Sequence, residues 1–223
     1  MVPWGWLDLA LIGALAFVGQ ALLVPVGVTG FNFFAGHESD ASLAFFTQVF
    51  LLYGLLFASI WALGLRRHGA DWSVLGFRPV DIRSLGVLLG LVALVVLGAN
   101  LVVRSFVRLP LTHDLFVFGH HPRQVLLMVV LVLLVAPLGE EVLFRGFLLQ
   151  GLARRWGFWP AAVVTSAVFA LAHVWPYLYV PIFIMGLAFA WLFWRTGSLW
   201  ASIAAHAAMN ATSLVVTGLF YRS

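Results

Sequence analysis

The stretch Gly139-Glu140-Glu141-Val142-Leu143-Phe144-Arg145-Gly146 places three ionisable side chains inside an otherwise apolar run. Apolar residues flank it on both sides, from Val125 to Val135 and from Phe147 to Leu152. This pattern predicts a helix that lies inside a lipid bilayer. A charge at the centre of a bilayer costs about 3 kcal/mol, so ionisable residues at that depth usually serve a function. The rest of the chain indicates what these side chains face.

The composition predicts an all-α protein, a polytopic transmembrane helical bundle. Of the 223 residues, 63% are hydrophobic and 9% are charged, and the mean hydropathy is +1.06. A soluble domain carries about 25% charged residues. We therefore expect residues 1–223 to form a single transmembrane domain in contact with the lipid bilayer. The net charge of +4 comes without a basic run, so no nucleic-acid partner is expected, and the absence of cysteine excludes disulfides and thiolate chemistry.

A helix needs about 20 apolar residues to cross a membrane, and by this criterion the sequence predicts seven spans. They are Leu7 to Val26, Ala41 to Gly64, Ser84 to Val103, Gln124 to Leu152, Trp159 to Trp175, Tyr177 to Trp194 and Leu199 to Phe220. The fourth span would reach about 43 Å at 1.5 Å per residue. We expect it to tilt, to kink near Pro137 or to project from the membrane. The connection at Pro176 is very short, so spans five and six should be antiparallel neighbours.

The arginines predict the orientation of the chain. If the charged loop from Arg66 to Arg83 faces the cytoplasm, seven arginines lie on that side and four on the other. The positive-inside rule then predicts a cytoplasmic amino terminus and an external carboxyl terminus. All basic residues are arginine, a coding bias typical of prokaryotes, so we expect a multi-pass protein of a prokaryotic cytoplasmic membrane. The histidines between Arg104 and Arg123 are expected in a solvated loop rather than in a metal site.

Polar residues occur at membrane depth on three of the predicted spans. They are Glu140, Glu141 and Arg145 on span four, His173 on span five, and His206 and Asn210 on span seven. Counted from the proposed cytoplasmic ends, the four groups Glu140, His173, His206 and Asn210 lie roughly 11 to 21 Å deep. We therefore expect them to meet in one cavity inside the membrane.

Spacing divides these residues among helix faces, because residues four apart share a face. Glu141 can pair with Arg145 along its own helix, and His206 points together with Asn210. Glu140 is turned by about 100° from Glu141 and should face something else. Two adjacent carboxylates in a low dielectric resist joint ionisation, so one of them is suited to act as a general base.

The set suits the addition of water to a carbonyl group. Glu140 and His173 would activate the water, and His206 and Asn210 would stabilise the oxyanion. A structural interpretation stays open for single members, because histidine or asparagine in a membrane helix often makes only an interhelical hydrogen bond. Glu140 has no comparable structural explanation, since it has no evident partner. It is the strongest candidate for a functional residue.

Three motifs in this order on separate spans resemble the CPBP family. They are Glu-Glu-x-x-x-Arg (Glu140, Glu141, Arg145), Phe-x-x-x-His (Phe169, His173) and His-x-x-x-Asn (His206, Asn210). The family comprises type II CAAX prenyl proteases, bacteriocin-processing enzymes and the abortive-infection group. The resemblance covers residues 124–212 and marks them as a catalytic core. It implies an intramembrane endopeptidase with a polar catalytic cavity. The implied catalytic residues are Glu140, Glu141, His173, His206 and Asn210, supported by Arg145 and Phe169.

The cofactor and the substrate are less constrained. No His-Glu-x-x-His motif occurs, so we expect a metal-free glutamate mechanism. Zinc is the alternative, with Glu140, His173 and His206 as its ligands. The expected partner is a membrane-associated peptide or protein, and prenylation of that substrate is not carried over from the family. A second hypothesis is a non-enzymatic membrane scaffold or immunity factor that uses the same polar set for packing or peptide binding.

Overall fold

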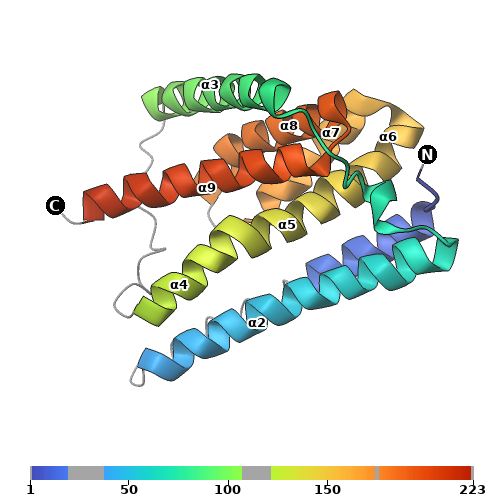
Figure 1. Ribbon diagram of the computed structural model, residues 1–223, viewed down its shortest axis with the longest axis horizontal. Coiled ribbons are helices and arrows are strands. Elements are labelled where there is room, and N and C mark those ends of the chain that lie inside the picture. Colours follow the sequence, from blue (N-terminus) through green and yellow to red (C-terminus); the bar gives the residue numbers. More distant parts are fainter. Residues whose placement is uncertain (1, 20–37, 107–121, 174–175, 222–223) are drawn as a thin grey trace.

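The computed structural model describes the whole chain except residues 1, 20–37, 107–121, 174–175 and 222–223, and the described part contains no strand (Figure 1). The α-helices are Trp6–Gly19, α2 Glu38–Ser59, α3 Ile82–Phe106, α4 Pro122–Val130, α5 Ala136–Glu141, α6 Gln150–Trp156, α7 Phe158–Leu171, α8 Tyr179–Thr196 and α9 Leu199–Tyr221. The π-helical segments are η1 Ile60–Leu65, η5 Leu131–Val135 and η6 Val142–Leu149, and the 3-10 turns are η2 Arg66–His68, η3 Trp72–Leu75 and η7 Pro176–Leu178. The predicted all-α bundle is confirmed.

Four of the described helices are long and apolar enough to cross a membrane. They are Phe45–His68, Leu85–Val102, Pro122–Trp156 and Pro176–Thr196, and two shorter apolar helices are Trp6–Gly19 and Phe158–Leu171. Helix α9 covers the seventh predicted span with 23 residues. The predicted first span continues to Val26, and its part beyond Gly19 lies outside the described residues, as does the loop with His113, Asp114, His120 and His121. The protein is therefore polytopic, and the number of seven spans stays a prediction.

The predicted fourth span belongs to one continuous helical rod of 35 residues, Pro122–Trp156 (Figure 1). At 1.5 Å per residue the rod is about 50 Å long, which exceeds a hydrocarbon core of about 30 Å. Segment η5 ends just before Pro137, and its hydrogen bonds reach five residues back, as in Ala136 N–H to the Leu131 carbonyl. A proline ring clashes with the carbonyl four residues earlier in an α-helix. The wider π turn accommodates Pro137, so the rod stays helical across it.

Helices α7 and α8 pack side by side on this rod. Ser166 and Gly186 lie the same distance in sequence before and after Pro176, and a Cβ on Gly186 would be 2.9 Å from the Cβ of Ser166. In an antiparallel hairpin, residues at equal distances before and after the turn lie next to each other, as these two residues do. The prediction that these two helices are antiparallel neighbours is confirmed.

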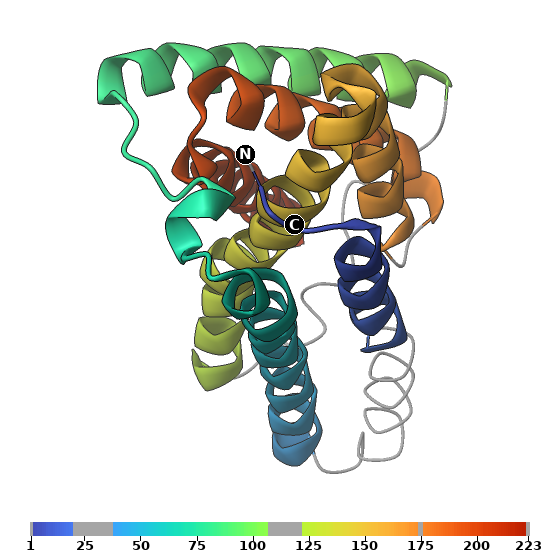
Figure 2. The ribbon, with the colours of Figure 1, turned by 90° about the vertical axis from the view of Figure 1, so that its right-hand side faces the viewer.

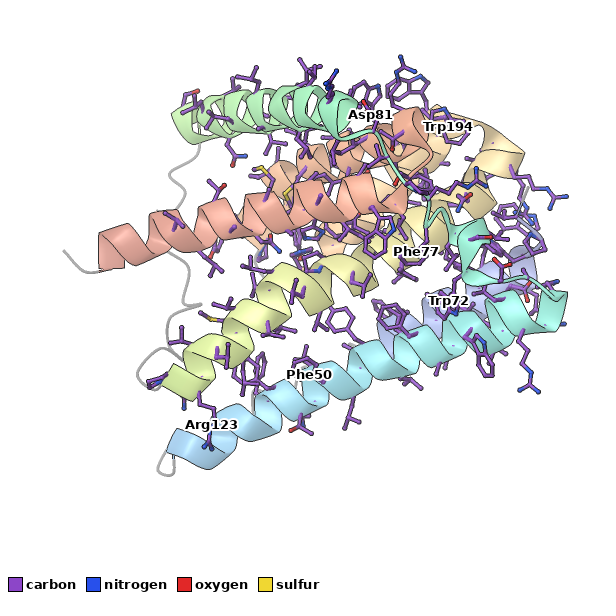
Figure 3. All side chains as sticks on the ribbon, in the orientation of Figure 1. Phe50, Trp72, Phe77, Asp81, Arg123 and Trp194 are labelled. Carbon is purple, nitrogen blue, oxygen red and sulfur yellow. The ribbon has the colours of Figure 1, made fainter. Side chains whose placement is uncertain are left out.

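Helices α2 and α3 lie on opposite sides of the molecule, with the rod and α7 to α9 between them (Figure 2). The charged connection from α2 to α3 runs along one end of the bundle, where Phe77 points toward the other helices (Figure 3). In this connection Leu75 is buried against Gly146 of η6, and the Gly76 carbonyl accepts a 2.7 Å hydrogen bond from the Leu199 amide at the start of α9. Gly76 has φ +98°, a conformation that favours glycine. The connection therefore ties the start of α9 to η6, and both carry site residues.

The amino-terminal segment packs against the carboxyl-terminal part of the rod. The Trp4 side chain is fully buried, its indole N–H donates to the Phe147 carbonyl at 3.1 Å, and its ring stacks on that of Phe147 at 4.8 Å. Arg154 donates to the Val2 carbonyl at 2.8 Å. Gly151 leaves room for the indole, because a Cβ there would lie 2.8 Å from Trp4 Nε1. These contacts attach the start of the chain to the segment that follows the two glutamates.

Candidate active site

A buried ion pair lies at the centre of the bundle. The Arg145 guanidinium donates from Nη1 to Glu141 Oε1 at 2.9 Å and from Nη2 to the Gly186 carbonyl of α8 at 3.0 Å. Both side chains are inaccessible, with 1% and 0% of their surfaces exposed. Three aromatic rings surround the guanidinium, with distances from Cζ to the ring centroids of 4.6 Å for Phe169, 5.5 Å for Phe189 and 5.9 Å for Phe144. The predicted pairing of Glu141 with Arg145 is confirmed.

His206 of α9 bridges the two glutamates. Its Nδ1 lies 2.9 Å from Glu141 Oε1, and its Nε2 lies 3.8 Å from Glu140 Oε2. A carboxylate only accepts hydrogen bonds, so we assign the donor role to Nδ1. The 3.8 Å separation is too long for a hydrogen bond. His206 is 3% exposed and stacks on Phe189 at 5.2 Å, which leaves Nε2 directed toward Glu140.

Glu140 faces a different side of the rod from Arg145, as its position on the helix predicts. Its Oε1 accepts a 2.8 Å hydrogen bond from the hydroxyl of Tyr53 on α2. Its Oε2 is buried and has no hydrogen-bond partner within the described residues. The sequence interpretation treats Glu140 as unpaired, and this is wrong for Oε1. A tyrosine hydroxyl within an otherwise apolar span is the signal that could have pointed to Tyr53.

His173 lies at the end of α7 and is partly exposed. Its Nδ1 is 2.8 Å from the Phe169 carbonyl one turn earlier, and its ring meets the Phe169 ring edge-on at 5.0 Å. The same Phe169 ring meets that of His206 at 5.9 Å. Phe169 therefore separates and orients the two imidazoles. Within the described residues no hydrogen bond joins His173 to Glu140, so their predicted joint action on water stays a prediction.

Asn210 lies one turn after His206 on α9 and donates from Nδ2 to the Val132 carbonyl at 2.9 Å. Val132 lies in π-helical η5, where the Leu131 carbonyl bonds the Ala136 amide five residues later. In the same pattern the partner of the Val132 carbonyl would be the nitrogen of Pro137, which carries no hydrogen. Asn210 therefore supplies the donor that the proline lacks. This contact corresponds to the structural interpretation that the sequence leaves open for Asn210.

The cluster brings two carboxyl groups, one guanidinium and one imidazole together. Buried charges are tolerated when they are paired. Because Glu141 holds Nδ1 of His206, its Nε2 is the ring nitrogen directed toward Glu140.

A family model described as type II CAAX prenyl endopeptidase Rce1-like matches residues 122–212. The chain belongs to this family of membrane proteases. The match to the Rce1-like model includes all five candidate catalytic residues and Arg145, and its bounds agree closely with the core of 124–212 that the motifs predict. Tyr53 lies outside the matched segment.

Two curated relatives are similar to the chain. It is 30% identical over 90 residues to the Bacillus subtilis (strain 168) protein named "Putative membrane peptidase YdiL", an alignment that covers 40% of the chain and 37% of that protein. It is 30% identical over 166 residues to the Escherichia coli protein named "Uncharacterized 24.3 kDa protein", covering 72% of the chain and 68% of that protein. No solved structure shows a significant match.

The donor arrangement can be compared with the needs of a metal. A catalytic zinc ion takes three protein ligands and a water. The described residues contain no group of three His, Asp or Glu side chains that could hold a metal ion. Glu140 and His206 come close together, and the Phe169 ring contacts the rings of both His206 and His173. The Nδ1 atoms of both histidines are engaged, as they commonly are in histidines that bind a metal through Nε2. The expected metal-free mechanism therefore stays a prediction.

Proposed function

We propose that this Rce1-like protein is an intramembrane endopeptidase that hydrolyses a peptide bond of a membrane-associated peptide or protein. One observation carries the proposal. The unpartnered Oε2 of Glu140 and the Nε2 of His206 lie 3.8 Å apart. A water molecule at the apex of this pair would make a hydrogen bond of about 2.8 Å to each of the two atoms. Water at buried sites requires such polar partners.

In the proposed reaction Glu140 is the general base. It takes a proton from the water, whose oxygen attacks the peptide carbonyl carbon, and it returns that proton to the leaving nitrogen as the carbon–nitrogen bond breaks. His206 would donate from Nε2–H to the oxygen that becomes negative. Glu141 holds the opposite side of the imidazole, and Arg145 holds Glu141. A buried carboxylate can orient an imidazole in this way.

His173 and Asn210 are assigned by resemblance to the family. His173 would be a second group that polarises the water, and Asn210 would offer its second amide hydrogen to the oxyanion. We propose that each of these two residues contributes to the reaction rate independently of the other. A single oxyanion donor typically contributes a factor of about 100 to 1,000 in kcat, so loss of Asn210 should slow the reaction without abolishing binding.

The central test is cleavage of a peptide library by the protein purified in detergent. Glu140→Ala and His206→Ala should each reduce cleavage by a factor of about 100 or more, because general acid–base groups contribute about 10² to 10⁴. Asp71→Asn is the matched control, since Asp71 is an exposed carboxylate that caps the 3-10 turn η3. Full activity in a correctly folded Glu140→Ala variant would show that Glu140 is not the general base.

The metal question has its own measurement. We propose a reaction without a metal, so cleavage should persist after dialysis against a strong chelator. If the chelator abolishes cleavage and zinc restores it, the attacking water is bound to a metal and Glu140 is not the general base. The non-enzymatic alternative predicts a third result, in which no variant or wild-type protein cleaves a peptide and Glu140→Gln keeps the cellular phenotype.

We further propose that the protein lies in a prokaryotic cytoplasmic membrane with a cytoplasmic amino terminus. The chain contains no cysteine, so single cysteines can be introduced without a background. An Asp71→Cys variant should react with a membrane-impermeant maleimide only after the membrane is opened. Labelling in intact cells would show that residue 71 lies outside and would contradict the proposed cytoplasmic amino terminus.

A further inference from the structure

Tyr53 reaches the candidate base from outside the segment that matches the family model. It lies on α2, 87 residues before Glu140, and its hydroxyl donates to Glu140 Oε1 at 2.8 Å. The family match begins only at residue 122. Helix α2 lies beside the α4 and α5 part of the rod (Figure 1). The first half of the chain therefore contributes a polar group to a site otherwise built from the second half.

Gly139 makes room for the tyrosine ring. A Cβ on Gly139 would lie 2.6 Å from Tyr53 Cε1, closer than real Cβ atoms approach their neighbours. The ring can therefore rest on the rod only where residue 139 has no side chain. Gly54, the residue after Tyr53, is different, because a Cβ there would meet nothing within 4 Å. The absence of a side chain is thus a requirement at Gly139 and not at Gly54.

The hydrogen bond gives the two oxygens of Glu140 different environments. The terminal torsion of a glutamate is broad, so a carboxylate with no partner rotates easily. Tyr53 holds Oε1 on the α2 side, and this leaves Oε2 on the side of His206 Nε2. Glu141 and Arg145 bond to each other rather than to Glu140. Within the described residues, Tyr53 is the group that sets the rotation of this carboxylate.

We propose that Tyr53 is a positioning residue that orients Glu140 for attack by water, an inference that rests on the proposed function. The phenol keeps its proton throughout, and it touches neither the water nor the substrate carbonyl. Its hydrogen bond holds Oε1 of Glu140 and leaves Oε2 free to accept the proton from water. Gly139 acts through Tyr53 by admitting the ring.

The first experiment removes only the hydroxyl. Tyr53→Phe keeps the ring against Gly139, so the fold and thermal midpoint should be retained. We expect kcat to fall about 10- to 100-fold, the factor that corresponds to one hydrogen bond to a charged group, with KM within about twofold. A merely structural role would instead lower the thermal midpoint or raise KM along with the loss of kcat.

The second experiment displaces the ring by adding one methyl group. Gly139→Ala should reduce kcat as much as Tyr53→Phe does, and combining the two should give less than the product of the single effects. Gly54→Ala is the matched glycine control. Ser59→Ala is the matched hydroxyl control, because the bond that Ser59 makes among the described residues is to the Leu55 carbonyl of its own helix at 2.7 Å. Both controls should keep wild-type kcat.

The outcomes separate the two proposals. An active wild type with an equally active, correctly folded Tyr53→Phe variant overturns the role of Tyr53 and leaves the proposed function intact. Equal losses in the control variants overturn it as well, because the effect would then be unspecific. A wild type that cleaves no peptide overturns the proposed function and, with it, this inference. Loss of kcat in Tyr53→Phe with an unchanged KM and thermal midpoint supports both.

Discussion

Replacing Arg145 by methionine is the sharpest test of the buried cluster. Arg145→Met removes the cation while keeping a flexible side chain among the three aromatic rings. Glu141, which is fully buried, then keeps only His206 as a charged partner at 2.9 Å. The Gly186 carbonyl also loses the 3.0 Å hydrogen bond from the guanidinium. The variant thus removes one of the two partners of the buried carboxylate and one hydrogen bond to a buried carbonyl.

The structure gives the expected size of the effect. Removing one partner of a buried ion pair destabilises a protein by about 3 to 5 kcal/mol. Because His206 still donates to Glu141, we take the lower end, about 3 kcal/mol. At about 2 to 4 °C per kcal/mol for a chain of this size, the midpoint of thermal unfolding should fall by roughly 6 to 12 °C. Glu141→Leu combined with Arg145→Met removes both charges and should recover at least half of that loss.

The assay is thermal unfolding followed by circular dichroism of the purified protein in detergent. Arg195→Met is the matched control, because Arg195 is exposed in the last turn of α8 and should contribute no more than about 1 kcal/mol. The reasoning is refuted if Arg145→Met is as stable as wild type. It is equally refuted if the double variant is less stable than Arg145→Met, since neutralising Glu141 should then have helped.

Two further predictions concern packing. In Gly186→Ala the new Cβ lies 2.9 Å from Ser166 Cβ, so α7 and α8 should be pushed apart and the protein destabilised by about 1 to 3 kcal/mol, measured by thermal unfolding. Gly98→Ala adds a methyl group to open space and should cause no loss; equal losses would contradict the reasoning. Trp4→Phe removes the indole N–H that reaches the Phe147 carbonyl and should cost about 1 kcal/mol in the same assay, and an unchanged midpoint would show that the hydrogen bond is not needed.

Local geometry made part of the site predictable. Glu141 and Arg145 are four residues apart on one helix, and this spacing places them on one face whatever surrounds the helix. The same geometry turns Glu140 away from Glu141, and it places Phe169 one turn before His173. The three-motif order also predicted the family segment, because it depends only on residue types and spacing.

Contacts between helices were not predictable in the same way. The pairing of His206 with Glu141 depends on the rotation and height of α9 relative to the rod, and neither follows from periodicity. Asn210 bonds Val132 because η5 is π-helical before Pro137, which changes the carbonyl that the proline leaves without a donor. An α-helical count predicts a different carbonyl, that of the residue four before the proline.

The sequence by itself determined that this chain is a membrane-embedded helical bundle. Its mean hydropathy is so high that water could not solvate most of its side chains. It also determined which glutamate pairs with Arg145, since that contact lies within one turn of one helix. Only the tertiary structure decided what the remaining charges meet: Tyr53 at one oxygen of Glu140 and His206 between the two carboxylates. Those contacts join segments 87 and 65 residues apart, and they depend on how whole helices pack, which the absence of side chains at Gly139 and Gly186 permits.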